Sequence, residues 1–276
     1  MSTSRRMRLA AAVGAAAVAL IATAGCGAAH DTAKAVGKTD TIAKILARVT
    51  DRTEKVGSAQ VRFVTDPGQG SPVTMTGTYS WGKGLAYDVM MDTKAAQMQS
   101  VQDAPTLRAL LVDGAYYYNV DPQPAGPLKG KHWMRVDVSA LLGEKGAAAV
   151  EKNGDPTAGL RYIGMSKDAE DLGEEPVRGI KAHHYHVTLD KDDLGAGMSA
   201  EDKKNLIGSM VGSGGGIDMD VWVDGKDLPV RLIQVMGKVK VTADFLKFGH
   251  AKTVTAPPAS DTADVSAQVK AAQPGS

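Results

Sequence analysis

Apolar and polar residues alternate along most of the chain, the pattern of strands with one buried face. The alternation is clearest at residues 217–224, where Ile217, Met219, Val221 and Val223 stand at every second position. It predicts about ten antiparallel strands joined by short turns. The segments concerned are 61–65, 73–80, 85–91, 107–112, 115–120, 133–138, 177–189, 217–224, 228–236 and 239–245.

Three segments follow the helical period instead. Residues 40–56 place apolar side chains on one side of a helix and charged ones on the other. Residues 139–152 are rich in Ala and Leu, and residues 199–211 begin with a capping serine and place Leu206 and Met210 on one face. After residue 253 the chain turns to Ala, Pro, Ser and Thr, which predicts a disordered tail at 254–276.

The N-terminus has the layout of a signal peptide. Residues 1–25 hold Arg5, Arg6 and Arg8 and then an uncharged apolar run that ends in small residues before Cys26. The run is too short for a permanent spanning helix. We expect a signal peptide at 1–25, a flexible tether at 26–38 and a single domain at 39–253.

The residues around Cys26 resemble a bacterial lipobox, Thr23-Ala24-Gly25-Cys26, in which cleavage before the cysteine accompanies attachment of diacylglycerol to its sulfur. The resemblance implies a lipid-anchored protein on the extracytoplasmic face of a bacterial cell membrane. Two alternatives stay open: an ordinary secretory signal that ends beside a cysteine, and a twin-arginine signal at Arg5-Arg6.

Charge and cysteine content exclude several classes of function for this protein. The 32 basic residues fall to 29 when Arg5, Arg6 and Arg8 are cleaved off, against 31 acidic residues, so a basic surface for nucleic acid is not expected. The single cysteine excludes an intrachain disulfide and any Cys-rich metal or iron–sulfur centre. If Cys26 carries lipid, thiol catalysis is excluded as well.

Common catalytic motifs are missing from the sequence. It contains no G-x-S-x-G, H-E-x-x-H, P-loop or C-x-x-C pattern. Residues 195–200 match a loose dinucleotide fingerprint, but that motif needs a parallel βαβ unit, and the flanking pattern predicts antiparallel strands. We therefore expect no catalytic residues, no cofactor and no enzyme. A cell-envelope hydrolase whose site assembles only in three dimensions is the minor alternative.

Two polar clusters contain residue types that bind metal ions. His184 and His186 would share one face of a strand beside His183, but a third ligand is not evident. Asp218, Asp220 and Asp224 resemble part of a calcium loop, yet their alternation with apolar residues places them on the solvent face of a strand. We predict no metal site.

Methionine is frequent in relation to the aromatic residues. Of 12 Met, only Met1 and Met7 lie in the signal segment, whereas the whole chain has 3 Phe and 3 Trp. Methionine side chains are flexible and polarizable, so a surface lined by them adapts to irregular apolar ligands such as acyl chains. Ordinary core packing is the alternative for any single methionine.

Several segments resemble, in order, the LppX/LprAFG family of actinobacterial lipoproteins. They are Asp220-Val221-Trp222-Val223-Asp224-Gly225-Lys226-Asp227-Leu228-Pro229-Val230-Arg231, the strand Gly179-Ile180-Lys181-Ala182-His183-His184-Tyr185-His186-Val187-Thr188-Leu189-Asp190, and Phe248-Gly249 followed by Val254-Thr255-Ala256-Pro257-Pro258. The resemblance implies an α+β, LolA-like fold: a strongly curved antiparallel half-barrel sheet with helices covering its concave face.

The same resemblance implies a carrier or chaperone that holds acylated lipids or lipoglycans in an apolar cavity. The alternative is a non-catalytic surface interaction or sensor lipoprotein with no lipid ligand. The side chains expected to face inward and contact acyl chains come from the predicted strands and the helix at 199–211. They are Val61, Phe63, Val73, Met75, Tyr79, Val89, Met91, Leu206, Met210, Ile217, Met219, Val221 and Val223.

Overall fold

The computed structural model describes residues 33–82, 84–153, 160, 166, 168–190, 216–249 and 251–272. The predicted signal peptide, Cys26 and the helix predicted at 199–211 lie outside these residues. The described strands are β1 (Ser58–Asp66), β2 (Val73–Ser80), β3 (Ala86–Asp92), β4 (Thr106–Val112), β5 (Ala115–Asn119), β6 (Trp133–Asp137), β7 (Asp168–Val177), β8 (Ile180–Asp190), β9 (Gly216–Asp224), β10 (Pro229–Met236), β11 (Val239–Phe248) and β12 (Thr262–Asp264).

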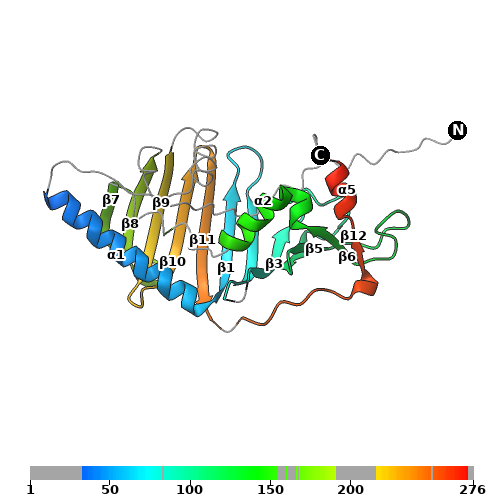
Figure 1. The fold of residues 1–276 in the computed structure, drawn as a ribbon, viewed down its shortest axis with the longest axis horizontal. Coiled ribbons are helices and arrows are strands. Elements are labelled where there is room, and N and C mark those ends of the chain that lie inside the picture. The colour runs from blue at the N-terminus through cyan, green and yellow to red at the C-terminus, as the bar shows by residue number, and fades with distance from the viewer. Residues whose placement is uncertain are drawn as a thin grey trace.

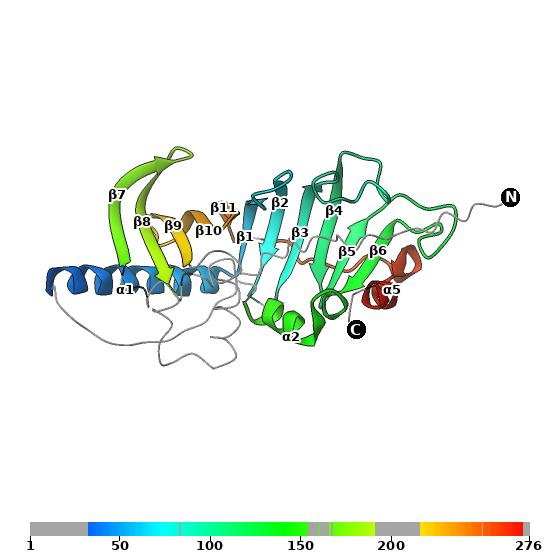
Figure 2. The ribbon, with the colours of Figure 1, turned by 90° about the horizontal axis from the view of Figure 1, so that it is seen from above.

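All twelve described strands form one open sheet in the order β12-β6-β5-β4-β3-β2-β1-β11-β10-β9-β8-β7. Two antiparallel meanders, β1 to β6 and β7 to β11, meet where β1 pairs with β11. The short β12 runs parallel to β6, so the sheet is mixed but mostly antiparallel. The strands bend instead of lying flat, most visibly β7 and β8 (Figure 2).

Helices cover one face of this sheet. Helix α1 (Ala33–Val56) crosses the β7–β11 half, and α2 (Val138–Asn153) lies over the other half on the same side (Figure 1). Helix α2 is kinked at Gly143, which has a positive φ of 70°. Helix α5 (Ser266–Ala271) packs beside α2 and β6, after the 3-10 turn η2 (Ala259–Asp261). No helix in the described ranges has both the length and the apolar composition to cross a bilayer.

One large apolar core lies between the sheet and the helices, and we call this side of the sheet the core face. Alternate residues of the strands supply it, because side chains of a strand point to opposite faces in turn. From α1 it receives Ile42, Leu46 and Val49, which lie at helical spacing. The expected open sheet with helices on one face is therefore confirmed.

The predicted strands are all present, but the sequence pattern missed two others. Strand β7 reads Asp-Ala-Glu-Asp-Leu-Gly-Glu-Glu-Pro-Val and is mostly exposed, so no apolar alternation marks it. Strand β12 has three residues, too few for a periodic signal. Both are edge strands that take their backbone hydrogen bonds from one better-defined neighbour, β8 and β6 respectively.

The tether and tail predictions need correction. Helix α1 begins at Ala33, so residues 33–38 are helical and not a flexible tether, in keeping with their Ala and Lys content. The segment predicted to be disordered from residue 254 contains η2, β12 and α5. It is ordered because Ala263, Val265 and Val269 bury their side chains in the main core, which a polar overall composition conceals.

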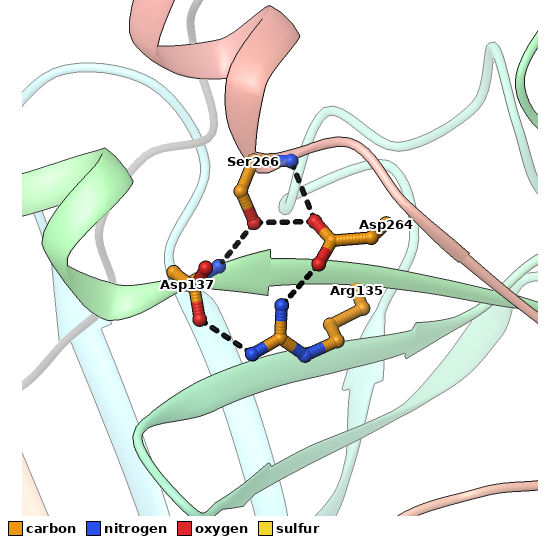
Figure 3. Close-up of polar contacts among 4 residues, drawn as sticks. All are labelled: Arg135, Asp137, Asp264 and Ser266. Carbon is orange, nitrogen blue, oxygen red and sulfur yellow. Dashed lines mark hydrogen bonds and ion pairs between the residues drawn. The ribbon is translucent and has the colours of Figure 1, made fainter. Parts of the chain in front are cut away.

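Polar contacts fix this C-terminal segment to β6 (Figure 3). Arg135 donates to both Asp264 and Asp137, with 2.5 Å to Asp137 Oδ1. The Asp137 N–H donates to Ser266 Oγ (2.9 Å), and the Ser266 hydroxyl donates to Asp264 Oδ1 (2.5 Å). Strand β6 is thus flanked by the C-terminal segment, in which β12 forms the edge of the sheet.

Candidate functional site

Five aromatic side chains cross the core face in a row, which we call the aromatic ladder: Phe63, Tyr79, Tyr87, Tyr116 and Tyr118. Phe63 comes from β1, Tyr79 from β2, Tyr87 from β3, and the last two from β5. Successive ring centroids lie 5.1, 5.0, 6.3 and 6.2 Å apart, within the range of tilted aromatic pairs. Direct pairing of Tyr79 with Tyr87 places their rings side by side.

Burial changes the pKa values of these tyrosines. Each ring is 4–8% exposed. Burial disfavours the phenolate and raises the pKa of Tyr116 to about 12. Burial, with smaller contributions from neighbouring tyrosines, also raises the pKa values of Tyr79, Tyr87 and Tyr118 above the ordinary value of 10.0. The four hydroxyl groups therefore stay protonated at physiological pH.

A pocket of about 1110 Å³ opens at the strand ends beside this ladder, and we call it the edge pocket. Its wall is formed by α2, the end of α1, the turn between β4 and β5, and residues 251–254. Leu85 and Leu111 line it, and Leu111 pairs with both Tyr87 and Tyr116. Strand pairing thus places one pocket-lining residue beside two residues of the ladder, although no ladder residue lines the pocket itself.

The edge pocket has a mixed lining. Val56, Leu85, Leu111 and Val150 contribute apolar surface. Charged side chains that line it are Glu54, Lys55, Asp113, Glu144, Glu151 and Lys252. Such a combination of apolar wall and polar groups suits an amphiphile, whose two ends need different surroundings.

The predicted lipid-contacting residues within the described ranges lie on the core face. Nine of them belong to the main buried core, and Val73 is half-buried against it. Ile217 is also buried, at 4% exposure. The nine are Val61, Phe63, Met75, Tyr79, Val89, Met91, Met219, Val221 and Val223. None of these residues lines the edge pocket, and Leu206 and Met210 lie outside the described residues.

Sequence reasoning found only Phe63 and Tyr79 of the ladder and missed its other members. A signal existed: Tyr116 and Tyr118 are two positions apart in β5 and so share a face, as Tyr87 and Val89 do in β3. The edge pocket gave no comparable signal, because its lining comes from stretches of chain that lie far apart in the sequence.

The histidine cluster forms a hydrogen-bond network on the opposite, outer face. Asp220 Oδ1 lies 2.9 Å from both His184 Nε2 and His186 Nδ1. The His184 ring stacks on Trp222 at 4.1 Å between centroids, and the Trp222 indole N–H donates to Glu175. No group of three or more potential ligands among the described side chains is arranged to hold a metal ion.

Comparison with solved structures identifies the architecture. The lipoprotein LppX of Mycobacterium tuberculosis superposes with a TM-score of 0.53 at 12% identity, over 78% of this chain and 98% of LppX. The chain has the fold of LppX. The resemblance seen in the sequence motifs is thereby confirmed at the level of the fold.

Curated relatives come from Streptomyces, and no protein-family model matches the chain. An uncharacterized 31.2 kDa protein of Streptomyces griseus is 29% identical over 242 residues, which cover 82% of this chain and 79% of that protein. A protein of Streptomyces coelicolor named "Putative lipoprotein SCO4650" is 25% identical over 95% of both chains.

Proposed function

We propose that this protein is a membrane-anchored lipoprotein of the bacterial cell envelope that binds acylated lipids or lipoglycans, as a carrier or chaperone. The edge pocket is the observation that carries the proposal. Its volume of about 1110 Å³ lies slightly above the range of ordinary ligand pockets, and it joins apolar walls to charged groups. A large amphiphile suits such a site better than a small polar metabolite.

The proposed anchor is Cys26, and it rests on the sequence. The signal pattern of residues 1–25 and the lipobox-like residues before Cys26 support lipid attachment on the extracytoplasmic face. The name of the Streptomyces coelicolor relative is consistent with this location. A diacylglycerol group supplies two acyl chains, enough for stable attachment.

Lipid extraction tests the binding function. We expect organic extracts of the purified full chain to contain lipid in a stoichiometric amount, and native mass spectrometry to show the same lipid as a bound mass. A protein that is recovered without lipid and that takes up none from phosphatidylcholine vesicles containing labelled diacylglycerol would contradict the proposal.

Two matched substitutions locate the binding site. Ala148 is an exposed residue of α2 that lines the edge pocket, so Ala148→Trp should fill the pocket without disturbing the core. Ala47 is exposed on α1 and does not line the pocket, so Ala47→Trp is the control. Only Ala148→Trp should reduce bound lipid, by about tenfold if the indole displaces a buried acyl segment.

A second candidate function is a non-catalytic surface interaction or sensor lipoprotein with no lipid ligand. The packing of the core face favours it: Val61, Val221 and their neighbours already contact other core side chains, and they do not line the edge pocket. Under this alternative, Ala148→Trp and Ala47→Trp would both leave the lipid content of the protein at background.

A further inference from the structure

The two ends of the sheet differ in how their last strand is covered. At one end, the three-residue β12 is held by the contacts of Arg135 and Ser266, and α5 packs beside β6. At the other end, β7 has ten residues, pairs with β8 and has no described strand on its other side. Every second residue of an antiparallel edge strand points its backbone N–H and C=O groups away from its neighbour. Strand β7 therefore presents outward backbone groups to another extended chain.

The stretch of β7 best suited to another strand is residues 168–172. The ladder with β8 is regular from Asp168 to Asp171, shifts register before Gly173 and later contains Pro176, which has no N–H to donate. Leu172 is 52% exposed, more than any other exposed large apolar side chain of the described residues. Helix α1 runs past β7 at this end of the sheet (Figures 1 and 2). A strand added beside β7 would thus have a helix along one of its faces.

The charge of β7 limits which chain can pair with it. The strand carries five carboxylates and no lysine, arginine or histidine. Three of the carboxylates contact described side chains of β8 or β9, namely those of Asp171, Glu174 and Glu175. Asp168 and Glu170 are exposed and make no ion pair with a described residue. These two carboxylates are available to a cation on an incoming strand.

The strand register adds two further acids to this corner of the outer face. Across β8, Asp168 lies in one row with Asp218, and Glu170 lies in one row with Asp220. Cross-strand neighbours have Cβ atoms about 4.5–5.5 Å apart, so Lys or Arg at alternate positions of an added strand would lie opposite Asp168 and Glu170. A second copy of β7 would instead place acids opposite acids, which is destabilising. The arrangement favours a basic strand from another protein.

We propose that β7 is a docking edge for an extended basic segment of another protein, which adds a strand to the sheet beside residues 168–172. Backbone hydrogen bonds provide affinity, and cations at alternate positions provide specificity. Charged side chains on an edge also protect it against aggregation, and carboxylates alone exclude acidic strands while attracting basic ones. The inference does not depend on lipid binding: the edge pocket is lined by the last residues of α1, whereas β7 lies near the start of that helix (Figure 1).

Two peptides of equal charge separate strand pairing from simple charge attraction. The first is a fluorescent, end-blocked Lys-Val-Arg-Val-Lys peptide, and the second is the same peptide with all backbone amides N-methylated. The purified full chain should bind the first at least about tenfold more tightly in fluorescence anisotropy, because the second cannot donate two or three backbone hydrogen bonds.

Hydrogen exchange locates the bound peptide on the sheet. Addition of the first peptide should slow the exchange of β7 amides at residues 169–172, because an added strand covers that edge. The amides of β12, at the other end of the sheet, should exchange at an unchanged rate.

Two double variants test the role of the acids. Asp168→Asn with Glu170→Gln removes two exposed carboxylates that have no ion pair with a described residue, so the fold is unaffected and peptide binding weakens by about fivefold. Asp51→Asn with Asp103→Asn is the matched control: both residues are exposed, neither lies on β7, and the net charge changes equally. The control should bind the peptide as wild type does.

Four results overturn the docking edge. Equal binding of the two peptides means attraction by charge without strand pairing, and an equal loss in both double variants means that the overall charge, not β7, attracts the peptide. Absence of binding at millimolar peptide removes the proposed partner class. Self-association of the full chain that slows exchange at residues 169–172 assigns the edge to a second copy of this chain.

Discussion

The two halves of the sheet use their polar side chains differently. In the β1–β6 half, four buried tyrosine rings lie in a row on the core face. In the β7–β11 half, the notable polar groups are paired with one another on the outer face. Asp244 is 4% exposed and receives 2.7 Å hydrogen bonds or ion pairs from Arg231 and Arg178.

The Asp244 contacts have a structural effect that the tyrosines lack. Arg178 lies in the turn between β7 and β8 and also donates to the carbonyl oxygens of Val230 and Phe245, in β10 and β11. The turn is thus held over the outer face of strands two and three places away in the sheet. Paired charges hold the β7–β8 turn in one half, whereas the row of buried aromatic rings lies on the core face of the other half.

The largest expected effect comes from removing the C-terminal segment, which belongs to the β1–β6 half. Truncation after Pro258 deletes η2, β12 and α5 and exposes the core side chains that Val265 and Val269 cover. Two buried valines and the β12 ladder predict a loss of about 4 kcal/mol in the free energy of unfolding. Chemical denaturation measures this loss.

Hydrogen exchange shows whether the loss of stability is confined to the β1–β6 half. Amides of β5 and β6 should exchange faster in the truncated protein, while those of β9 and β10 keep their protection. Truncation after Ala272 removes only residues beyond α5 and should change neither measurement. Uniformly faster exchange across both halves would contradict the division of the sheet into two regions.

Next in size is the loss of the Asp244 carboxylate. Asp244→Asn leaves Arg231 and Arg178 without their shared anion and weakens the hold on the β7–β8 turn. Breaking a buried charge cluster in this way should lower the free energy of unfolding by about 3 kcal/mol, because the arginines are partly exposed and recover some hydration. Faster exchange should appear in β7 and β8 and leave β4 and β5 unchanged.

Acid should weaken both regions, each through its own carboxylates. Burial raises the pKa of Asp244, but hydrogen bonds from Arg231 and the charges of Arg231 and Arg178 outweigh it, so the pKa is lowered. A lowered folded-state pKa gives stability above the unfolded value of about 3.9, and that stability is lost as pH falls through the folded pKa. The free energy of unfolding should therefore decline below about pH 4.

Two variants show how much each half of the sheet contributes to this acid dependence of the free energy of unfolding. Hydrogen bonds that Asp261 accepts from His132 lower the pKa of Asp261. Burial raises the pKa of Asp264, but contacts with Ser266 and Arg135 outweigh burial and lower it. Asp244→Asn and the Pro258 truncation should each make the decline below pH 4 shallower, as followed by denaturation at several pH values. A decline that both variants retain in full would show that other groups cause it.

The sequence predicted the parts of the fold that repeat a periodic pattern. Val61, Met75 and Val221 lie on the core face because strand alternation and burial are local, and the same holds for Ile42 and Leu46 in α1. The sequence pattern did not predict the edge strand β7, because its side chains are mostly exposed and many of them are acidic. The order of the C-terminal segment was not predicted because only three of its apolar residues, separated by polar ones, enter the main core.

The candidate site was harder to predict than the fold. The rings of Tyr87 and Tyr116 are brought together by strand pairing through Leu111, and pairing partners are not evident from a single sequence. Edge-pocket residues Glu54, Asp113 and Lys252 come from distant segments for the same reason. The motif resemblance predicts a lipid-binding site, whereas the strand register determines which residues come together at the pocket.

The smallest expected effect tests whether burial, and not hydrogen-bond geometry, makes the Asp244 cluster important. Arg108 and Asp88 form a two-fold contact on the outer face of the β1–β6 half, with distances of 2.8 and 2.7 Å, comparable to the 2.7 and 3.1 Å between Arg231 and Asp244. Their side chains are 49% and 36% exposed. Exposed pairs contribute about 0.2–1 kcal/mol, so Asp88→Asn should change the free energy of unfolding by less than 1 kcal/mol. A loss as large as that of Asp244→Asn would mean that geometry alone determines the strength of these contacts, and the contrast between the two halves would then need another cause.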